Sequence, residues 1–409
     1  MLAFEDARDL VLARCQTLGS EVVGIGEARG RVLAEDVAAP FDLPAWDSSA
    51  MDGYALDAQG LERGDRLRVE GFFPAGRSDA GSVSPGMAAR ILTGAALPAG
   101  ANCVVPFEQV DDRSGVIRLV TSPRVGDHIR RQGSDVSRGD VVLEAGAVLG
   151  HPEIAILASI NRTSVAVGRR PRVAILSTGD ELLTSGEPLR PGCIFDSNGP
   201  ALAAATVEAG GCPSLLGIAA DDPDLLRDSL REGLRADVLV TSAGVSAGDR
   251  DLVRATLTGL GVEEIFWSVA IQPGRPVAFA VADGCLVFSL PGNPVAALLT
   301  FALLVRPALR RLLGHREPVE VIRRAVLGED VRPRPDRMTL RRVGLEWVDG
   351  RLVATGCGPQ ATGHLLTLAR ADGIALIPAG PALLPEGSPI DIHPLRPDGD
   401  FSRRTRGRD

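Results

Sequence analysis

The fold is decided by the stretch Val173-Ala174-Ile175-Leu176-Ser177-Thr178-Gly179-Asp180-Glu181-Leu182. Its first four residues are apolar and partly β-branched, and a loop of small and acidic residues follows at once. A short apolar run that ends in such a loop is typical of a strand covered on both faces. The stretch therefore predicts a buried strand with a polar loop at its carboxyl end.

The same arrangement recurs twice downstream. Val238-Leu239-Val240 leads into Thr241-Ser242-Ala243-Gly244-Val245-Ser246-Ala247-Gly248-Asp249, and Leu286-Val287-Phe288-Ser289 leads into Leu290-Pro291-Gly292-Asn293-Pro294. Further strands are expected at 215–218 and 277–280, with helices at about 200–209, 223–234, 251–260 and 295–313. Strands that alternate with helices of this length imply parallel strands joined by crossover helices. The sequence predicts a doubly wound α/β domain.

The rest of the chain has other patterns. Apolar residues recur at helical spacing from Phe4 to Leu18, and Gly19 follows where a left-handed cap would stand. Residues 66–148 contain short apolar runs punctuated by Gly, Pro, Asp and Ser, which indicates β-hairpins. Short strands return at 338–340, 352–354 and 374–377 and suggest a small C-terminal β-domain or barrel. Residues from about 397 are expected to fray.

Composition limits the possible functions. A chain of 409 residues exceeds one hydrophobic core, so two to four domains are expected. No apolar run could span a bilayer and the N-terminus does not resemble a secretory leader, so we expect a cytoplasmic protein without a membrane partner. Six scattered cysteines are interpreted as reduced thiols. A net charge of −8 argues against nucleic acid as a partner, and the absence of lysine makes every fixed cation an arginine.

The three loops suggest a site. Open parallel sheets bind ligands beyond the carboxyl ends of their strands, and small residues there let a ligand approach backbone N–H groups and helix N-termini. An anionic, phosphorylated ligand would suit such a rim. A tight turn is the favoured interpretation for any one loop alone, and the three loops together reverse that preference. Acidic residues in the same loops would need a bridging hard cation such as magnesium. They are Asp180, Glu181, Asp221, Asp222, Asp249 and Asp251. Helix N-caps or solvated charges are the favoured alternative for Asp180, Asp222 and Asp249.

A second group of polar motifs lies in the β-rich part. Residues 43–55, LPAWDSSAMDGYA, place two acids, two serine hydroxyls and the only tyrosine in one expected loop. The stretches 90–95, RILTGA, and 129–135, IRRQGSD, complete the group. As surface turns these stretches would be unremarkable, so spacing alone leaves a function open.

Taken together, SAMDGYA, RILTGA, IRRQGSD, STGDEL, GVSAGD and LPGNP resemble the MoeA family, in that order and over nearly the whole chain. The resemblance implies an elongated homodimer with a MogA-like molybdopterin-binding α/β domain at 171–317. The N-terminal helix at 1–19 would pack on it. A linking β-domain would comprise 20–42 and 141–170, an inserted β-rich domain 43–140, a C-terminal β-barrel 318–396 and a flexible tail 397–409. The cleft would lie between the α/β domain of one subunit and the inserted domain of the other.

The resemblance also implies an activity. Such enzymes take adenylyl-molybdopterin and molybdate, use Mg²⁺, release AMP and leave molybdenum on the dithiolene, which completes molybdenum cofactor synthesis. By motif, the catalytic residues would be Asp52, Thr93, Asp135, Glu181, Asp221 and Asp251, with Glu181 and Asp221 also holding the metal. The cofactor-binding residues would be Ser177, Thr178, Gly179, Ser242, Gly244, Ser246, Gly248, Gln272, Arg275, Pro291, Gly292, Asn293, Pro294 and Thr362.

Some positions depart from the family pattern. Ala243 stands where the first of two paired glycines is usual, and we expect it to adopt a backbone conformation that its methyl group tolerates. Ser268 and Gln272 replace frequent lysines, whereas Arg275 keeps the charge and Thr362 keeps a hydroxyl. The expected partners are the upstream molybdopterin adenylyltransferase and apo-molybdoenzymes. A non-catalytic molybdopterin-binding scaffold and a related phosphoanhydride hydrolase are the alternatives. A hydride-transfer enzyme is disfavoured, because no G-x-G-x-x-G follows the first α/β strand.

Overall fold

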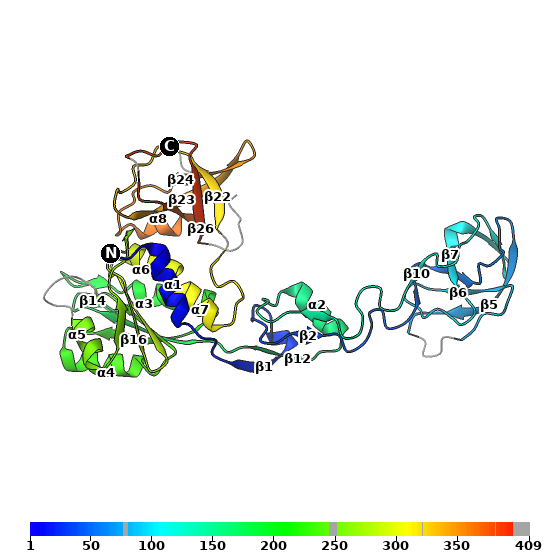
Figure 1. Cartoon of the computed structure of the whole chain (residues 1–409), viewed down its shortest axis with the longest axis horizontal. Coiled ribbons are helices and arrows are strands. Elements are labelled where there is room, and N and C mark those ends of the chain that lie inside the picture. Colours follow the sequence, from blue (N-terminus) through cyan, green and yellow to red (C-terminus); the bar gives the residue numbers. More distant parts are fainter. Residues whose placement is uncertain (77–80, 245–251, 321, 381, 396–409) are drawn as a thin grey trace. The chain divides into compact units, whose positions relative to one another are not determined.

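The computed structural model describes residues 1–76, 81–244, 252–320, 322–380 and 382–395 (Figure 1). The chain divides into two compact units. The larger unit comprises residues 1–34, 145–150 and 164–409, and the smaller comprises 35–144 and 151–163. The larger unit holds the α/β domain and the C-terminal strands, and the smaller one holds most of the β-rich region.

A six-stranded sheet forms the centre of the α/β domain, in the order β16-β13-β17-β21-β20-β18. The four strands from β16 to β21 are parallel, as the apolar runs predicted. Strand order reverses between β13 and β17, because the chain adds β16 on one side of β13 and β17 on the other. The strands are β13 (Arg172–Thr178), β16 (Cys212–Ala219), β17 (Val238–Ser242), β18 (Glu263–Phe266), β20 (Ala278–Ala282) and β21 (Cys285–Leu290).

Helices cover both faces of this sheet. Along β13, Val173 and Ile175 join a core with α1, α3 and the helical run from α6 to α7, whereas Ala174 and Leu176 join a core with α4 and α5. This alternation is the period of two expected for a strand buried on both sides. The helical segments are α1 (Phe4–Arg14), α3 (Asn198–Glu208), α4 (Pro223–Gly233), α5 (Leu252–Gly259), α6 (Pro294–Thr300), the π-helical turn η3 (Phe301–Val305) and α7 (Arg306–Leu312).

Two expectations for this domain were wrong. The strand predicted at 277–280 is antiparallel to its neighbour, because only Asp283 and Gly284 separate β20 from β21. Both residues have positive φ, +38° and +86°, as a tight hairpin turn requires and a crossover does not. The first helix ends at Arg14 rather than near Leu18. Cys15 is already extended, and the Leu18 N–H donates to Leu312 O at the end of α7.

The C-terminal strands close into a five-stranded barrel. Its pairings run β23-β24-β22-β26-β25 and return to β23. Leu340, Ile374 and Leu376 also join the core beneath α1 and α7, so the barrel packs on the α/β domain. The short strand β19 (Ile271–Gln272) pairs with β23 and ties the two together. The barrel elements are β22 (Arg323–Leu327), β23 (Met338–Val348), β24 (Arg351–Gly356), α8 (Leu365–Ala369), β25 (Gly373–Ile377) and β26 (Pro389–Pro394).

The smaller unit is built around a six-stranded sheet in the order β7-β4-β6-β5-β9-β8. Its strands are β4 (Gly53–Leu56), β5 (Arg66–Phe73), β6 (Met87–Ile91), β7 (Cys103–Pro106), β8 (Val110–Arg113) and β9 (Val116–Leu119). The unit also contains β2 (Val37–Ala38), β3 (Ser48–Ser49), η2 (Phe107–Gln109), β10 (Ile129–Arg130), β11 (Val141–Leu143) and α2 (His151–Ser159). The remaining short elements belong to the larger unit: β1 (Ser20–Gly24), η1 (Ile25–Glu27), β12 (Ser164–Gly168), β14 (Leu182–Leu183) and β15 (Ile194–Phe195).

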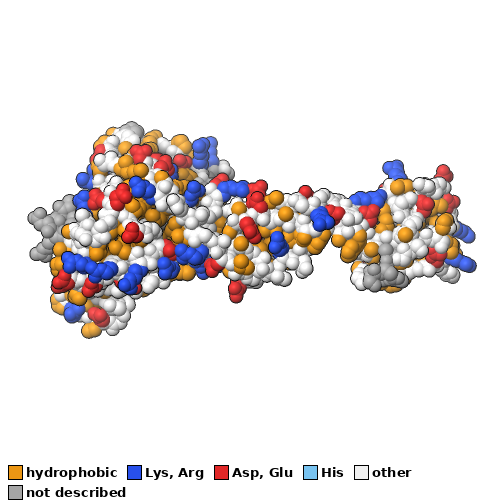
Figure 2. All heavy atoms as spheres, turned by 60° about the horizontal axis from the view of Figure 1, so that its bottom comes forward, with side chains coloured by type: hydrophobic (Ala, Val, Ile, Leu, Met, Phe, Trp, Pro, Cys, Tyr) orange, Lys and Arg blue, Asp and Glu red, His pale blue; other side chains and the backbone are white. Residues whose placement is uncertain are grey.

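Within the described residues, no helix is both long enough and apolar enough to cross a membrane. On the face drawn in Figure 2, arginine and acidic side chains are interspersed over the surface.

Candidate functional site

Three predicted loops meet at the point where strand order reverses. Ser177 of β13 is in register with Ser242 of β17, and Ser242 is in register with Leu290 of β21. The loops that follow these strands therefore leave the sheet side by side, as the sequence predicted. Ser177, Thr178 and Ser242 are buried, whereas Gly292 and Asn293 are exposed. Ser246, Gly248, Asp249 and Asp251 lie outside the described residues.

Two residues that sequence reasoning missed connect all three loops. Asp196 accepts a hydrogen bond of 2.7 Å from Ser177 Oγ and two of 3.0 Å from the N–H groups of Asn198 and Gly199. The Asn198 side-chain amide donates to Ser242 Oγ at 2.7 Å and to Gly292 O at 2.8 Å. The carboxylate of Asp196 thus occupies the N-terminus of α3, so that helix end is already filled by the chain's own anion.

The second loop has an unfavourable backbone conformation. Ala243 has φ +76°, in the left-handed region, so the expectation that its angle suits a methyl group was wrong. Gly244 follows with φ +74°, and a methyl group there would stand 2.3 Å from Val253 Cγ2. The Ala243 N–H donates to Leu290 O at 3.1 Å, which joins this loop to the end of β21. Neighbouring contacts therefore hold the strained residue in place.

The predicted metal ligands lie at the carboxyl ends of β13 and β16. Glu181 is exposed, and its carboxylate folds against the backbone of Gly179, where an added Cβ would stand 2.8 Å from Glu181 Cδ. The Asp221 N–H donates to Asp180 Oδ1 at 3.0 Å. Asp222 caps α4 by accepting from the N–H groups of Asp224 and Leu225, as its alternative interpretation predicted. Among the described residues, no three His, Cys, Asp or Glu side chains form a metal-binding group.

A pocket of about 420 Å³ gathers a second set of predicted residues. It lies between the segment 271–276, the start of α6 and the barrel. The predicted residues that line it are Gln272, Arg275, Pro291, Asn293 and Thr362. Arg337, which the sequence did not single out, also lines it. Within the described part of the chain, Arg275 forms no salt bridge, whereas Arg337 pairs with Asp336. The guanidinium of Arg275 makes the pocket suitable for an anion, whereas the charge of Arg337 is already paired with Asp336.

The barrel side of this pocket is held by Arg342, which was also missed. Its side chain is fully buried, and Nη2 donates to Pro359 O at 2.9 Å and to Ala361 O at 3.2 Å. Gln360 exchanges hydrogen bonds with the Arg342 backbone N–H and carbonyl. The loop that carries Thr362 is therefore fixed from inside the barrel. The sequence could not single out Arg342, because the chain has no lysine and every fixed positive charge is an arginine.

The three motifs of the smaller unit come together within that unit. Ser49 exchanges backbone hydrogen bonds with Gly94 and Ala95, and β3 pairs with β10. Thr93 donates to Asp52 Oδ1 from both its N–H and its Oγ1, at 2.7 Å each. These bonds lower the pKa of the exposed Asp52 carboxyl. The exposed Asp135 is placed by its own N–H, which donates to Leu43 O at 3.0 Å.

Asp47 was quoted only as part of a motif, and it organises the segment at 130–132. Its carboxylate accepts from the Gln132 N–H at 2.8 Å and from Arg131 Nη1 at 2.6 Å. The bond from the Gln132 N–H, with that from Arg131, lowers the pKa of Asp47. Asp47 is thus a structural anion that fixes the turn before Asp135.

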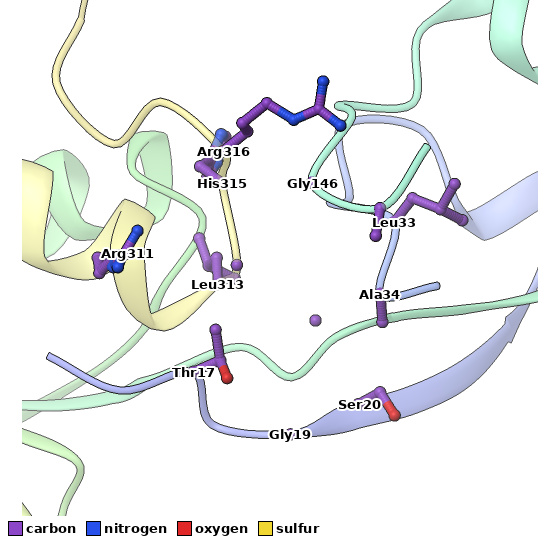
Figure 3. A pocket seen from close by; sticks show the side chains of 13 residues that line it. Thr17, Gly19, Ser20, Leu33, Ala34, Gly146, Arg311, Leu313, His315 and Arg316 are labelled. Atoms are coloured by element: carbon purple, nitrogen blue, oxygen red, sulfur yellow. The ribbon is translucent and has the colours of Figure 1, made fainter. Parts of the chain in front are cut away.

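A hollow of about 500 Å³ lies in the larger unit, at the C-terminal end of α7 (Figure 3). Its lining includes Thr17, Ser20, Arg311, His315 and Arg316. Burial, with the nearby Arg310, lowers the pKa of His315 to about 4, so this imidazole is neutral at pH 7. None of the predicted site residues lines this hollow.

Comparison with known proteins identifies the family. Residues 2–161 match the MoeA N-terminal region (domains I and II), 174–311 a probable molybdopterin binding domain, and 324–395 the MoeA C-terminal region (domain IV). A molybdopterin molybdenumtransferase of a Nostoc species is 37% identical over 91% of this chain and 88% of its own. The enzyme of that name from Bacillus subtilis is 34% identical over 92% and 90%.

A solved structure agrees with these matches. The MoeA molybdopterin biosynthesis protein of Pyrococcus horikosii superposes with a TM-score of 0.84 at 32% identity, over 97% of this chain and 99% of its own. The family expected from the motifs is thereby confirmed, and so is the multidomain α/β and β fold. The chain belongs to the MoeA family.

Proposed function

We propose that this chain is a molybdopterin molybdenumtransferase that takes adenylyl-molybdopterin and molybdate and releases AMP with the completed molybdenum cofactor. The observation that carries the proposal is the pair of adjoining subsites in the larger unit. One is the rim of loops after β13, β17 and β21, and the other is the pocket lined by Arg275 and Arg337. Gly292 belongs to the rim, and its neighbours Pro291 and Asn293 line the pocket. A ligand could therefore occupy both subsites together.

The rim is suited to the pterin and its phosphate. Its exposed members are the backbone at Gly292 and Asn293, and Gly244 is partly exposed. Backbone N–H groups in such turns bind phosphate oxygens. Ser177 is interpreted differently, because its hydroxyl hydrogen is already donated to Asp196. We assign the phosphate contacts to Gly244, Gly292 and Asn293, with Thr178, Gly179, Ser242 and Pro294 shaping the loops around them.

The pocket is suited to an oxyanion. Molybdate is an anion that accepts hydrogen bonds, and Arg275 is a positively charged donor in this pocket; Arg337 also lines it, with its charge paired to Asp336. Thr362 and Gln272 add neutral hydrogen-bonding groups to the same lining. We assign the molybdate to this pocket, next to the rim where the dithiolene would lie.

Magnesium fits the carboxylates at the ends of β13 and β16. Glu181 and Asp221 offer hard oxygen ligands, and Mg²⁺ usually binds one or two carboxylates together with phosphate oxygens and water. When bound, the ion would stabilise the charge that develops as the phosphoanhydride P–O bond breaks. Asp180, which receives the Asp221 N–H, keeps the backbone of Asp221 next to the end of β13.

Asp52, Thr93 and Asp135 belong to the smaller unit, and we propose that they act from a second copy in a homodimer. The reaction would take place in the cytoplasm, where thiols stay reduced, and the six cysteines are free thiols in this structure. Burial, the largest cause, raises the pKa of Cys15, Cys103 and Cys285 to about 12, which suits inert core thiols. The upstream adenylyltransferase and apo-molybdoenzymes would be transient partners.

The test is AMP release from adenylyl-molybdopterin by the purified protein with magnesium and molybdate, with Glu181→Gln and Asp222→Asn beside the wild type. The proposal predicts release by the wild type and Asp222→Asn, and at least about a hundredfold less by Glu181→Gln. Asp222→Asn is the matched control, because Asp222 only caps α4. Tight pterin-nucleotide binding without release would indicate the non-catalytic scaffold instead.

A further inference from the structure

Asn198 holds a central position among the loops of the rim. We infer that Asn198 is a positioning residue that keeps the second and third loops in the arrangement that binds the substrate phosphate. This inference rests on the proposed function of the rim. The residue touches no reacting atom itself and would act through Ser242 and Gly292.

The orientation of the Asn198 amide is fixed by its partners. The carbonyl of Gly292 can only accept, so the NH₂ group of Asn198 must face it. The second hydrogen of that NH₂ group is directed to Ser242 Oγ. Asn198 is only 7% exposed, so water cannot readily replace either bond. Among the common side chains, glutamine carries the same NH₂ group but is one methylene longer.

Asn198 is itself firmly anchored. Its backbone N–H donates to Asp196 Oδ1, and the other oxygen of that carboxylate receives the Ser177 hydroxyl. The first loop is therefore joined to the same network as the second and third. Ser242 and Gly292 come from different βα connections, so removing the Asn198 side chain would disconnect the second loop from the third, while Ser177 would stay bonded to Asp196.

Ala243 explains why the second loop needs this support. A left-handed conformation is unfavourable for alanine, and φ is +76° here. The strained residue lies directly after Ser242, and its Cβ would stand 3.1 Å from a Cβ added at Gly292. Asn198 thus donates hydrogen bonds to Ser242, which precedes Ala243, and to Gly292, which packs against Ala243. Without this bridge, we expect Ala243 to relax to negative φ and move the loop.

The experiment compares Asn198→Ala and Asn198→Asp with Thr206→Val in the full chain. Thr206 is the matched control, because it is buried in the same helix and its hydroxyl donates to Leu202 O within α3. We expect Asn198→Ala to raise KM for adenylyl-molybdopterin at least about tenfold with kcat changed less. Asn198→Asp should raise it further, because a carboxylate cannot donate to Gly292 O. Thr206→Val should change stability but not KM.

A rescue separates positioning from general destabilisation. Glycine adopts positive φ readily, so Ala243→Gly should recover about half or more of the lost affinity when added to Asn198→Ala. Relief of strain by this substitution should stabilise Thr206→Val as well, but should leave its KM unchanged. An unchanged KM in Asn198→Ala, or no recovery by Ala243→Gly, would overturn the inference.

A second readout does not depend on turnover. Amide hydrogen exchange of the ligand-free protein should quicken at 241–244 and 290–293 in Asn198→Ala, but not in Thr206→Val. If exchange quickens but the wild type releases no AMP, the proposed function fails and the positioning role stands. If the wild type turns over and Asn198→Ala changes neither KM nor exchange, the positioning role fails and the proposed function stands.

Discussion

Thr93 donates two hydrogen bonds to one oxygen of Asp52, from its backbone N–H and from Oγ1, each 2.7 Å long. The two residues come from separate motifs, SAMDGYA and RILTGA, which β4 and β6 bring together by pairing Gly53 with Ile91. Both bonds favour the ionised carboxylate, so the pKa of Asp52 lies below its ordinary value. The pair thus keeps a fixed negative charge on the surface of the smaller unit.

Replacing Thr93 by valine should raise the pKa of Asp52 partway to its ordinary value. The Oγ1 donor is lost, but the backbone N–H, the larger cause of the lowering, remains. The pKa of Asp52 is lower in the folded chain than in the unfolded chain. The lowered pKa therefore stabilises the fold at pH values above the unfolded pKa, and this stabilisation is lost as the pH falls through the folded pKa. Carboxyl NMR titration would measure the change, with Thr121→Val as the control. An unchanged Asp52 titration would contradict this account.

Replacing Arg275 by glutamine should weaken molybdate use. The guanidinium is exposed, lines the pocket and forms no salt bridge within the described part of the chain. A charged hydrogen bond of about 1.5 kcal/mol corresponds to about a tenfold rise in KM for molybdate. Steady-state kinetics would test this, with Arg227→Gln as the control, because Arg227 forms an ion pair with Asp224 on the surface of α4. Equal effects of the two substitutions would show that the pocket is not the molybdate site.

Replacing Asp237 by asparagine should destabilise the α/β domain. Burial of this carboxylate opposes ionisation, but Arg169 and the Arg172 N–H outweigh burial and lower the pKa. Loss of these charged bonds should cost about 2 kcal/mol of unfolding free energy at pH 7. The difference should shrink as pH falls through the folded pKa of Asp237, because the depressed pKa stabilises only while the carboxylate is ionised.

Denaturant unfolding at several pH values would check this prediction. Asp224→Asn is the control, since its surface ion pair with Arg227 should contribute under about 1 kcal/mol. A difference between wild type and Asp237→Asn that grows on acidification would contradict the assigned direction of the pKa shift.

Much of the fold was predictable because burial on both faces leaves a clear pattern. The runs at 173–176, 238–240 and 286–289 became β13, β17 and β21, and the helix expected at 295–313 became α6, η3 and α7. Sequence reasoning failed where a short connection decided the outcome. Asp283-Gly284 made β20 antiparallel, and the strand Glu263–Phe266 was not predicted because it begins with two exposed glutamates.

The site was predictable to the extent that its residues follow strands directly. Gln272, Arg275, Pro291, Asn293 and Thr362 were named from motifs and share one pocket. Arg337, Asn198 and Asp196 were missed, because their roles come from contacts across the fold that sequence spacing does not reveal. The positive φ of Ala243 was not predicted for the same reason, because contacts with three neighbouring segments stabilise it.

The most direct test of molybdenum transfer is X-ray absorption at the molybdenum edge, on product formed from adenylyl-molybdopterin, molybdate and magnesium. The account predicts two sulfur ligands on molybdenum, from the dithiolene, formed only with the wild-type chain present. Product in which molybdenum keeps only oxygen ligands would contradict the central claim, even if AMP had been released.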